Sequence, residues 1–312
     1  MADATNCAGA LPCASGPGLA APFLLVSVGS LIATAVMLSK LAAAAGAPML
    51  GYLGAVWFGA AGLLFLPLVF GRGPLGVAGT LHYGLGAGFL MIVPSAMGYL
   101  AVAHVGAGYI SLTFAFPVLL TWLIARGLRM DGARPGQGAG VLAGLAGGVL
   151  LASAKLAGAG GPGGSVYWVM LATAIPVTLA LGNIFRTRYW PAGARPLPLA
   201  AFSVLAGALM VLPFAALTEG GRLSLLWQSP ELAGLTAAGA AVVAAQYVLQ
   251  FRLQALAGPV YMSQIGGVAA MTGAVIAVVA LGETLPPMFW PAALMIAAGT
   301  VLFHNAAAKR RR

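Results

Sequence analysis

Residues 232–256 read LAGLTAAGAAVVAAQYVLQFRLQAL, a run of 25 residues in which Arg252 is the one charged side chain. A helix needs about 20 predominantly apolar residues to cross the hydrocarbon core of a bilayer. Gln246, Gln250 and Gln254 recur at every fourth position, so they fall on one face of a helix. The stretch therefore predicts a membrane-crossing helix with a polar stripe along one side.

The whole chain has the composition of that run. Of its 312 residues, 61% are apolar and 6% are charged, and the mean hydropathy is +0.99. A soluble domain carries roughly 25% charged residues, so the composition excludes a water-soluble protein. Ten such apolar runs follow one another, at residues 19–39, 48–70, 76–101, 105–126, 136–156, 165–186, 196–217, 232–256, 259–281 and 286–306.

These runs predict an all-α polytopic membrane protein with ten transmembrane helices. A β-barrel is excluded because the runs are continuously apolar rather than alternating with a period of two. Glycine also recurs at every fourth position from Gly132 to Gly148. Such a series predicts a helix surface on which another backbone can come close.

The basic residues predict the orientation of the chain in the membrane. Twelve of the 15 Lys and Arg fall on the side of the N-terminus, which leaves Lys40, Lys155 and Arg222 on the other side. Because cytoplasmic segments carry the excess of Lys and Arg, we expect both termini to be cytoplasmic in a bacterial inner membrane. Residues 1–18 lack the basic region of a signal peptide and are expected to form a tail, as are the basic residues 307–312.

An internal repeat divides the chain into two halves. At an offset of 152 residues, Tyr109-Ile110-Ser111 falls on Tyr261-Met262-Ser263, and Asp131 falls on Glu283. Residues 19–157 and 165–306 then form five helices each, with a glycine-rich linker at 158–164. Because five is odd, the second half enters the membrane from the opposite side, which predicts an inverted repeat of the kind that secondary transporters use.

Several motifs resemble those of a known family. The stretch HVGAGYISLTFAFP at 104–117, GPVYMS at 258–263, LGETL at 281–285 and Ala298-Gly299 in the last run are similar to the two EamA-type halves of the drug/metabolite transporter superfamily. The resemblance covers about residues 19–306. The chain departs from the family pattern at Arg129-Met130-Asp131, where the family has Gly-Glu, and at Pro291, where it often has glycine.

The resemblance implies a basket of ten helices around a central cavity, with the fifth and tenth helices at the periphery. It also implies export of small metabolites, and the chain is similar to the aromatic amino-acid exporter branch. A monomer suffices for such a pathway, and a homodimer is the alternative oligomeric state.

Polar residues inside the apolar runs are candidates for a substrate pathway, because a polar side chain in hydrocarbon costs free energy unless it finds a partner or water. Gln246 and Gln250 are candidates on this ground. Ser27, Ser30 and Thr34 form a hydroxyl stripe on the first run. These hydroxyls either line the pathway or bond to backbone carbonyls of their own helix.

Aromatic residues supply the remaining candidates. His82, Tyr83 and Tyr99 lie on a run otherwise built of small residues, and Trp168 and Tyr261 begin later runs. Aromatic faces can hold a substrate ammonium by cation–π attraction. The alternatives are an interfacial belt for Trp168 and tyrosines satisfied by neighbouring backbone.

The chemistry that is absent from the sequence narrows the function. No Asp or Glu falls in the middle of a run, there is no nucleotide-binding loop, and no metal-ligand spacing occurs. We therefore expect no enzyme, no cofactor, no metal and no nucleic-acid partner. The expected function is a secondary transporter that exports small zwitterionic metabolites, most of all amino acids, by uncoupled alternating access; efflux of drug-like cations and lipid handling are the alternatives.

Overall fold

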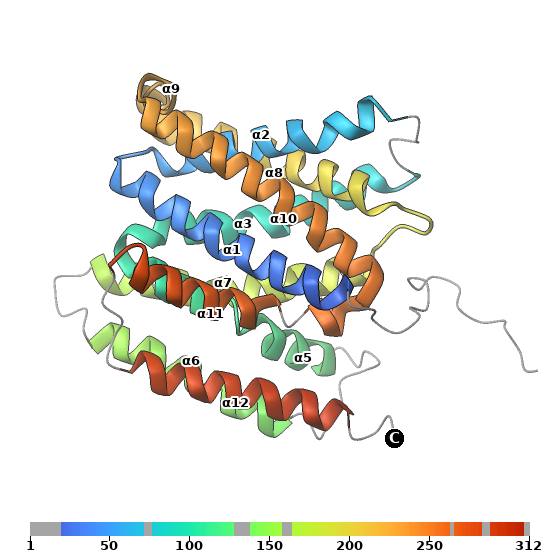
Figure 1. The fold of residues 1–312 in the computed structure, drawn as a ribbon, viewed down its shortest axis with the longest axis vertical. Helices are drawn as coiled ribbons and strands as arrows, with labels where there is room; N and C mark the ends of the chain where they lie inside the picture. Colours follow the sequence, from blue (N-terminus) through green and yellow to red (C-terminus); the bar gives the residue numbers. More distant parts are fainter. Residues whose placement is uncertain are drawn as a thin grey trace, which may run out of the picture.

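The computed structural model describes residues 20–71, 77–127, 138–157, 164–262, 265–282 and 288–308, and all regular secondary structure in these ranges is helical (Figure 1). The elements are α1 (Ala20–Ala44), α2 (Met49–Val69), α3 (Thr80–Val105), α4 (Ala107–Thr113), α5 (Pro117–Gly127), α6 (Gly138–Ala157), α7 (Gly164–Arg188), α8 (Pro196–Glu219), the short η2 (Gly220–Arg222) and α9 (Leu225–Gln228), α10 (Pro230–Met262), α11 (Ile265–Val279) and α12 (Phe289–Ala308).

Seven spans are long and apolar enough to cross a membrane. They are α1, α2, α3, the α4–α5 segment, α7, α8 and α10. The apolar parts of α6, α11 and α12 within the described residues are shorter. An α-helix satisfies its backbone hydrogen bonds internally, which is what hydrocarbon requires. The chain is a multi-pass helical membrane protein.

The run at 105–126 is not one helix, which corrects the sequence-based boundary. It divides at Phe114 to Phe116, where backbone N–H groups bond three residues back, as from Phe114 to the carbonyl of Ser111 at 3.2 Å. Pro117 begins α5 instead of kinking a continuous helix. A Cβ on Gly266 of α11 would meet the Phe114 carbonyl, so the glycine lets α11 approach this break.

Two further boundaries differ from the expected ones. The third helix runs on to Val105 and is stopped by Gly106, whose φ of +88° favours glycine. Helix α10, which contains the eighth apolar run, continues through Gly258-Pro259 to Met262, whereas the sequence predicted a break at 257–258. A proline inside a membrane helix is tolerated because the freed backbone groups find other partners.

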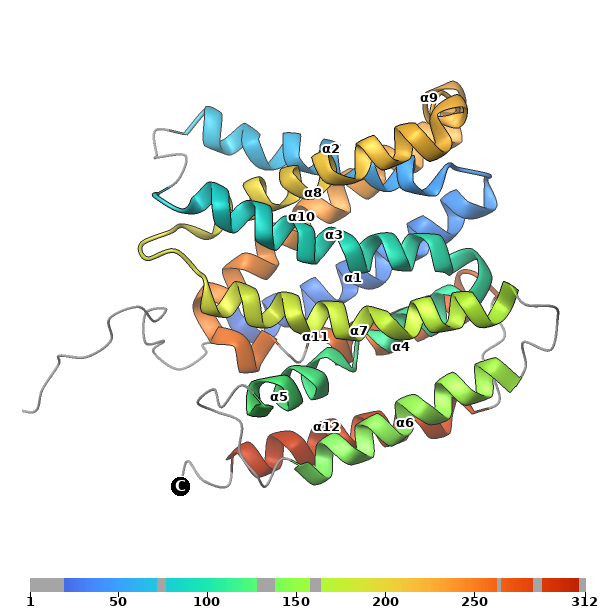
Figure 2. The same ribbon diagram turned by 180° about the vertical axis from the view of Figure 1, so that it is seen from behind.

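The helices form two layers with a separate pair at one edge. Helices α1, α10 and α11 pack together on the face seen in Figure 1, and α3 and α7 pack together on the opposite face, seen in Figure 2. Helices α6 and α12 pack on each other at the lower edge of both views. The start of α1 and the end of α12 lie on the same side of the bundle (Figure 1).

Contacts between the two halves of the chain are reciprocal. Helix α1 packs on α10 and α11, and α7 packs on α3 and the α4–α5 segment; α2 packs on α8 and on α10, and α8 packs on α2 and on α3. At the α6–α12 interface, a Cβ on Gly147 would meet Ala292 and Ile296, and one on Gly299 would meet Gly140 and Gly144. The two sets of contacts correspond at an offset of 152 residues, which pairs Gly147 with Gly299, Gly140 with Ala292 and Gly144 with Ile296.

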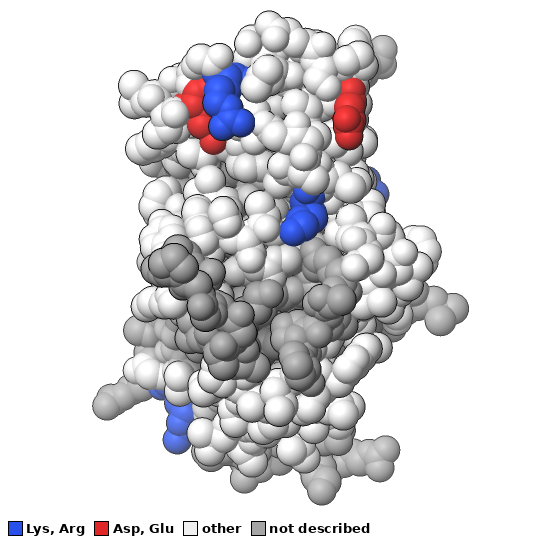
Figure 3. Space-filling model, turned by 90° about the vertical axis from the view of Figure 1, so that its left-hand side faces the viewer, with Lys and Arg blue, Asp and Glu red and all other residues white. Residues whose placement is uncertain are grey.

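The two ends of the bundle carry different charges. Both acidic residues of the described ranges, Glu219 and Glu231, lie at what we call the acidic end, with Lys40 and Arg222. This end faces the viewer in Figure 3, where the few charged side chains stand among wide uncharged surfaces. The last turns of α5 and α7 reach the other end (Figure 1), which we call the basic end.

The acidic end is tied together by side-chain contacts with backbone. The Glu219 carboxylate accepts hydrogen bonds from the N–H groups of Leu50 at 3.2 Å and Gly51 at 2.8 Å, which caps α2. The Lys40 ammonium donates to the carbonyls of Val102 at 3.3 Å and Ala103 at 3.4 Å, at the end of α3. These contacts tie α8 to α2 and α1 to α3 at this end.

Candidate functional site

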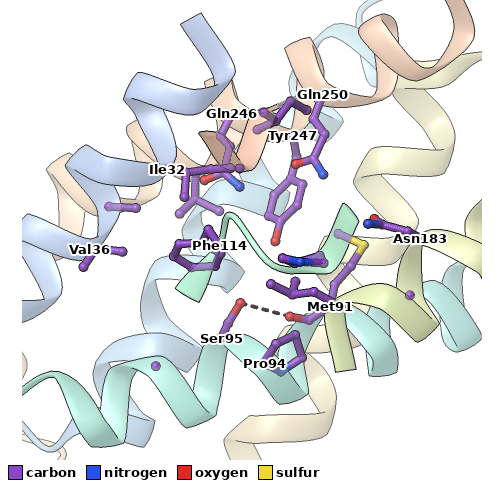
Figure 4. A pocket seen from close by; sticks show the side chains of 18 of the residues that line it. Ile32, Val36, Met91, Pro94, Ser95, Phe114, Asn183, Gln246, Tyr247 and Gln250 are labelled. Atoms are coloured by element: carbon purple, nitrogen blue, oxygen red, sulfur yellow. Dashed lines mark hydrogen bonds between the residues drawn. The ribbon is translucent and has the colours of Figure 1, made fainter. Parts of the chain in front are cut away.

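A cavity of about 130 Å³ lies at mid-length in the bundle, between the two helical layers. Its wall comes from α1, α2, α3, α4–α5, α7, α10 and α11, and therefore from both halves of the chain. Apolar side chains such as Ile32, Met91 and Phe114 form much of it (Figure 4). The polar members of the wall are Ser39, Ser95, Tyr99, Asn183, Arg186, Gln246, Tyr247 and Gln250.

Helix α10 supplies the most polar wall of this central cavity. Gln246, Tyr247 and Gln250 point from α10 toward the α3 side, where Ser95 and Met91 lie (Figure 4). Gln246 and Gln250 fall one turn apart on one face, so both reach the same space. The buried Oε1 of Gln250 has no hydrogen-bond partner, which leaves an acceptor ready for a solute or a water.

Helix α3 and its neighbours form the facing wall. The Ser95 hydroxyl donates to the carbonyl of Met91 at 2.9 Å (Figure 4). The Tyr99 ring lies 5.8 Å from that of Tyr52, and the ring of Trp57 meets Tyr247 edge-on at 5.3 Å. These contacts fix the hydroxyls and aromatic faces that a solute would meet.

Arg186 brings a positive charge to the wall from α7. The side chain is 4% exposed, and its Nη2 donates to the Asn183 Oδ1 at 2.6 Å. Its Nε has no hydrogen-bond partner. The phenols of Tyr83 and Tyr247 are the ionisable groups that interact with it electrostatically. Among the described lining residues, Arg186 is thus the one cation, and the others are neutral.

From the sequence, Arg186 is expected only as one of the basic residues that set the orientation of the chain in the membrane. The expected run ended at this residue, so hydropathy placed it at the interface, whereas α7 continues to Arg188. The signal that could have found it is the pair of arginines two positions apart. Residues separated by two lie on opposite sides of a helix, so one of the pair had to face inward.

Three of the predicted site residues line the central cavity. Gln246 and Gln250 lie side by side on α10, and Tyr99 faces them from α3. Gln254, the third amide of the stripe, is buried on the same helix but does not belong to the cavity wall, and its Oε1 has no partner. The polar face of α10 thus follows the four-residue spacing of the three glutamines in the sequence, and two of them line the cavity.

Three aromatic candidates lie elsewhere. His82 is exposed and borders a second hollow at the basic end, with Gly79, Phe185 and Tyr189. Tyr83 is buried beside Phe185 and Trp190 and borders the same hollow. Trp168 stacks on His104, with ring centroids 4.2 Å apart, and joins α7 to α3 near the acidic end. None of the three belongs to the cavity wall described above.

The remaining candidates are Ser27, Ser30 and Tyr261. Both serines are half-buried on α1, outside the cavity wall, and the Thr34 hydroxyl bonds to the carbonyl of Ser30 at 2.9 Å. The stripe thus bonds in part within its own helix, and Ser39 is the hydroxyl of α1 that reaches the cavity. Tyr261 belongs to the last turn of α10, and its side chain lies outside the described residues.

Metal binding finds no support in the described part of the chain. No group of three or more His, Cys, Asp or Glu side chains lies close enough there to hold an ion. The polar groups of the cavity are amides, hydroxyls and a guanidinium. Such groups bind solutes by hydrogen bonds and by charge.

Comparisons with known proteins identify the fold alone. No protein-family model matches the sequence, and no curated relative does either. A solved structure described only as "Crystal structure of protein" is similar to the chain, with a TM-score of 0.61 and 21% sequence identity. The match covers 90% of this chain and 98% of that one, so the arrangement of helices described above also occurs, over nearly its full length, in a known structure.

Proposed function

We propose that this chain is a secondary transporter that exports small zwitterionic metabolites, amino acids above all, through the central cavity. The observation that carries the proposal is the cavity itself, which lies at mid-length and is walled by helices of both halves around buried polar groups. Transporters built from two related halves bind their substrate at this place, near the midplane and between the halves. The resemblance of the sequence motifs to EamA-type transporters favours the same function.

The proposal includes ten crossings arranged as two inverted repeats of five. The reciprocal contacts of Gly147 and Gly299 support it. If two halves are related by a two-fold axis, each contact between a residue of one half and a residue of the other is repeated by their two counterparts. Helices α6 and α12 contain 20 residues each, which is about 30 Å of helix. The start of α1 and the end of α12 lie on the same side of the bundle (Figure 1), which agrees with an even number of crossings.

The broken helix between α4 and α5 is a second support. Phe114 and Pro117, which flank the break, belong to the cavity wall. Non-helical backbone at membrane depth is tolerated where it borders a cavity, and discontinuous helices form substrate sites in many transporters. The break also offers a place where α5 can move relative to α4 during alternating access.

The lining favours a small zwitterion over a drug-like cation. A carboxylate in the membrane is the usual partner of a cationic drug, and the described lining residues include neither Asp nor Glu. The volume of about 130 Å³ is below the roughly 300–1,000 Å³ of pockets that hold drug-sized ligands. Without an acidic residue in the described wall, we propose uncoupled facilitated diffusion or exchange.

The proposed orientation puts the basic end in the cytoplasm. Arg126, Arg188 and Arg195 lie at that end, and the positive-inside rule assigns it to the cytoplasmic side of a bacterial inner membrane. Both termini are then cytoplasmic. The cavity wall comes from a single chain, so a monomer suffices for transport.

The function is tested with the purified full-length chain in liposomes. Labelled amino acids of several sizes are loaded inside, and efflux is followed with and without a proton gradient. We expect saturable efflux that the gradient does not change. Efflux of toxic cations alone would replace the proposal by drug export, and flipping of labelled phospholipid without solute efflux would replace it by lipid handling.

A further inference from the structure

Arg186 is a buried charge without a counter-ion among the described residues. The side chain is 4% exposed, and an arginine stays protonated in a protein. Glu219 and Glu231, the acidic residues of the described ranges, lie at the acidic end, whereas Arg186 lies in the part of α7 near the basic end. A buried charge is costly unless it is paired and hydrogen-bonded, and no acidic side chain of the described ranges pairs with Arg186.

The guanidinium is partly used and partly free to bind. One Nη2 hydrogen bond goes to Asn183, which orients the group, while Nε has no partner. The described ionisable groups that interact with it electrostatically are the phenols of Tyr83 on α3 and Tyr247 on α10, which are neutral at pH 7. The planar fork of an arginine matches the two oxygens of a carboxylate.

The neighbouring Arg188 indicates that the inward position of Arg186 is specific. Arg188 is exposed on the same helix, where a long side chain can extend its charge to the interface. Arg186 contributes instead to the cavity wall, beside Asn183 and opposite Gln250 and Tyr247. A residue that served only as a topology marker would gain nothing from this inward position.

We propose that Arg186 anchors the carboxylate of the transported solute, so that the cavity selects small monocarboxylates and accepts amino acids through their α-carboxylate. Asn183 holds the guanidinium in place, and the amide of Gln250 is within the same wall to contact the rest of the solute. An ammonium group on the solute is then dispensable, whereas the carboxylate is not. This inference rests on the proposed transport function, which it extends to the substrate class.

The test compares solutes that differ only in the anchoring group. Binding to the purified full-length protein in detergent is measured by tryptophan fluorescence, since Trp57 lines the cavity. For glycine, alanine, leucine and phenylalanine, the probes are the amino acid, its amide, the matching amine without the carboxylate and the matching acid without the ammonium. We expect the best-bound amino acid and its ammonium-free acid to bind at least about 100-fold more tightly than its amide and amine, because a site built for a hydrogen-bonded group rejects analogues that lack it.

Three variants test whether Arg186 is the source of the preference for the acid over the amide. Arg186→Gln is expected to lose the discrimination between acid and amide, Arg186→Lys to keep part of it, and Arg188→Gln to leave it unchanged. Size-exclusion profiles and thermal unfolding show whether each variant is folded. If Arg186→Gln does not fold, the acid-to-amide ratio of the unchanged protein decides the matter.

The inference is overturned if amides and amines bind as tightly as the acids, if no carboxylate binds, or if a folded Arg186→Gln variant keeps the preference. Its failure is distinct from that of the proposed function. Carboxylate binding without any flux in liposomes would contradict transport and leave the anchor in place. Flux of amino acids that is the same in folded Arg186→Gln would contradict the anchor and leave transport in place.

Discussion

The α6–α12 pair and the central cavity solve opposite packing problems with different residue types, glycines in the pair and large side chains around the cavity. In the pair, backbones meet: a Cβ on Gly299 would lie 2.6 Å from the carbonyl oxygen of Gly140. Around the cavity, large side chains such as Trp57, Tyr99 and Gln250 hold the helices apart. The difference separates a part of the molecule that packs from a part that can bind.

The first prediction tests the close packing of α6 on α12 by placing a side chain in their interface. Gly299→Val places methyl groups against the backbone of Gly140 and Gly144. Overpacking typically costs about 1–3 kcal/mol, and more where backbone cannot move. We expect a loss of about 3 kcal/mol in the free energy of unfolding, measured by denaturation of the purified protein in detergent.

The matched control is Gly62→Val in α2, where an added Cβ meets nothing within 4 Å. That variant is expected to unfold nearly as the unchanged protein does, apart from the small effect of valine on the helix. Equal stability of the two variants would contradict the close packing of α6 on α12.

The second test removes a polar group from the cavity. Gln250→Leu keeps the size of the side chain and deletes a buried acceptor that has no partner, so stability is expected to hold or to rise slightly. A lost hydrogen bond to the solute is worth about 1.4 kcal/mol. We expect about tenfold weaker solute binding, measured as the concentration for half-maximal efflux from liposomes.

Gln228→Leu on the exposed α9 is the control for Gln250→Leu. It changes the same residue type far from the cavity wall and should leave efflux unchanged. A Gln250→Leu protein that transports normally and a Gln228→Leu protein that does not would reverse the assignment of the binding region.

The third test weakens the acidic end without touching the cavity or the α6–α12 pair. Glu219→Gln removes the negative charge at the start of α2, where two N–H groups point at the carboxylate. Charge and capping at a helix N-terminus contribute about 1 kcal/mol. We expect the free energy of unfolding to fall by about 1 kcal/mol, with an unchanged affinity for solutes. A large change in affinity would mean that this end takes part in binding.

The smallest effect is expected at the His104–Trp168 stack. An aromatic pair contributes about 0.5–1.5 kcal/mol beyond its buried area, and His104 is exposed. His104→Ala should therefore lower the free energy of unfolding by about 0.5 kcal/mol, with unchanged efflux. Strong inhibition of efflux would place Trp168 in the pathway after all.

The sequence predicted the helices better than their interruptions. Each apolar run contains a helix of the structure because hydropathy and length are local properties. The break at 114–116 has a local signal in Pro117, which favours an interruption of the helix. The close approach of Gly266, from a helix more than 100 residues away, could not be predicted locally. The extension of α10 past Pro259 was missed because Gly-Pro ordinarily favours a turn.

The candidate site divides in the same way. Gln246 and Gln250 could be proposed from the sequence because their spacing defines a helix face, while Tyr99 could be proposed only as an aromatic side chain at the right depth; all three line the central cavity. His82 is one position before Tyr83, and that step of about 100° takes it to the exposed side of α3. The spacing of Arg186 and Arg188 indicates that the two lie on opposite sides of α7, but which of them faces the cavity depends on the packing of α7 against the other helices, which is a tertiary property.

The claim that the central cavity is the solute site is tested most directly by substrate protection of a cysteine. Ser95→Cys lines the cavity and Ser224→Cys is exposed at the acidic end; each is made in a chain with Cys7→Ser and Cys13→Ser. The rate of alkylation by a small maleimide is measured with and without amino acids. The account predicts slower labelling of Ser95→Cys at saturating amino acid and no change for Ser224→Cys. Equal labelling of Ser95→Cys with and without every amino acid tested would contradict it.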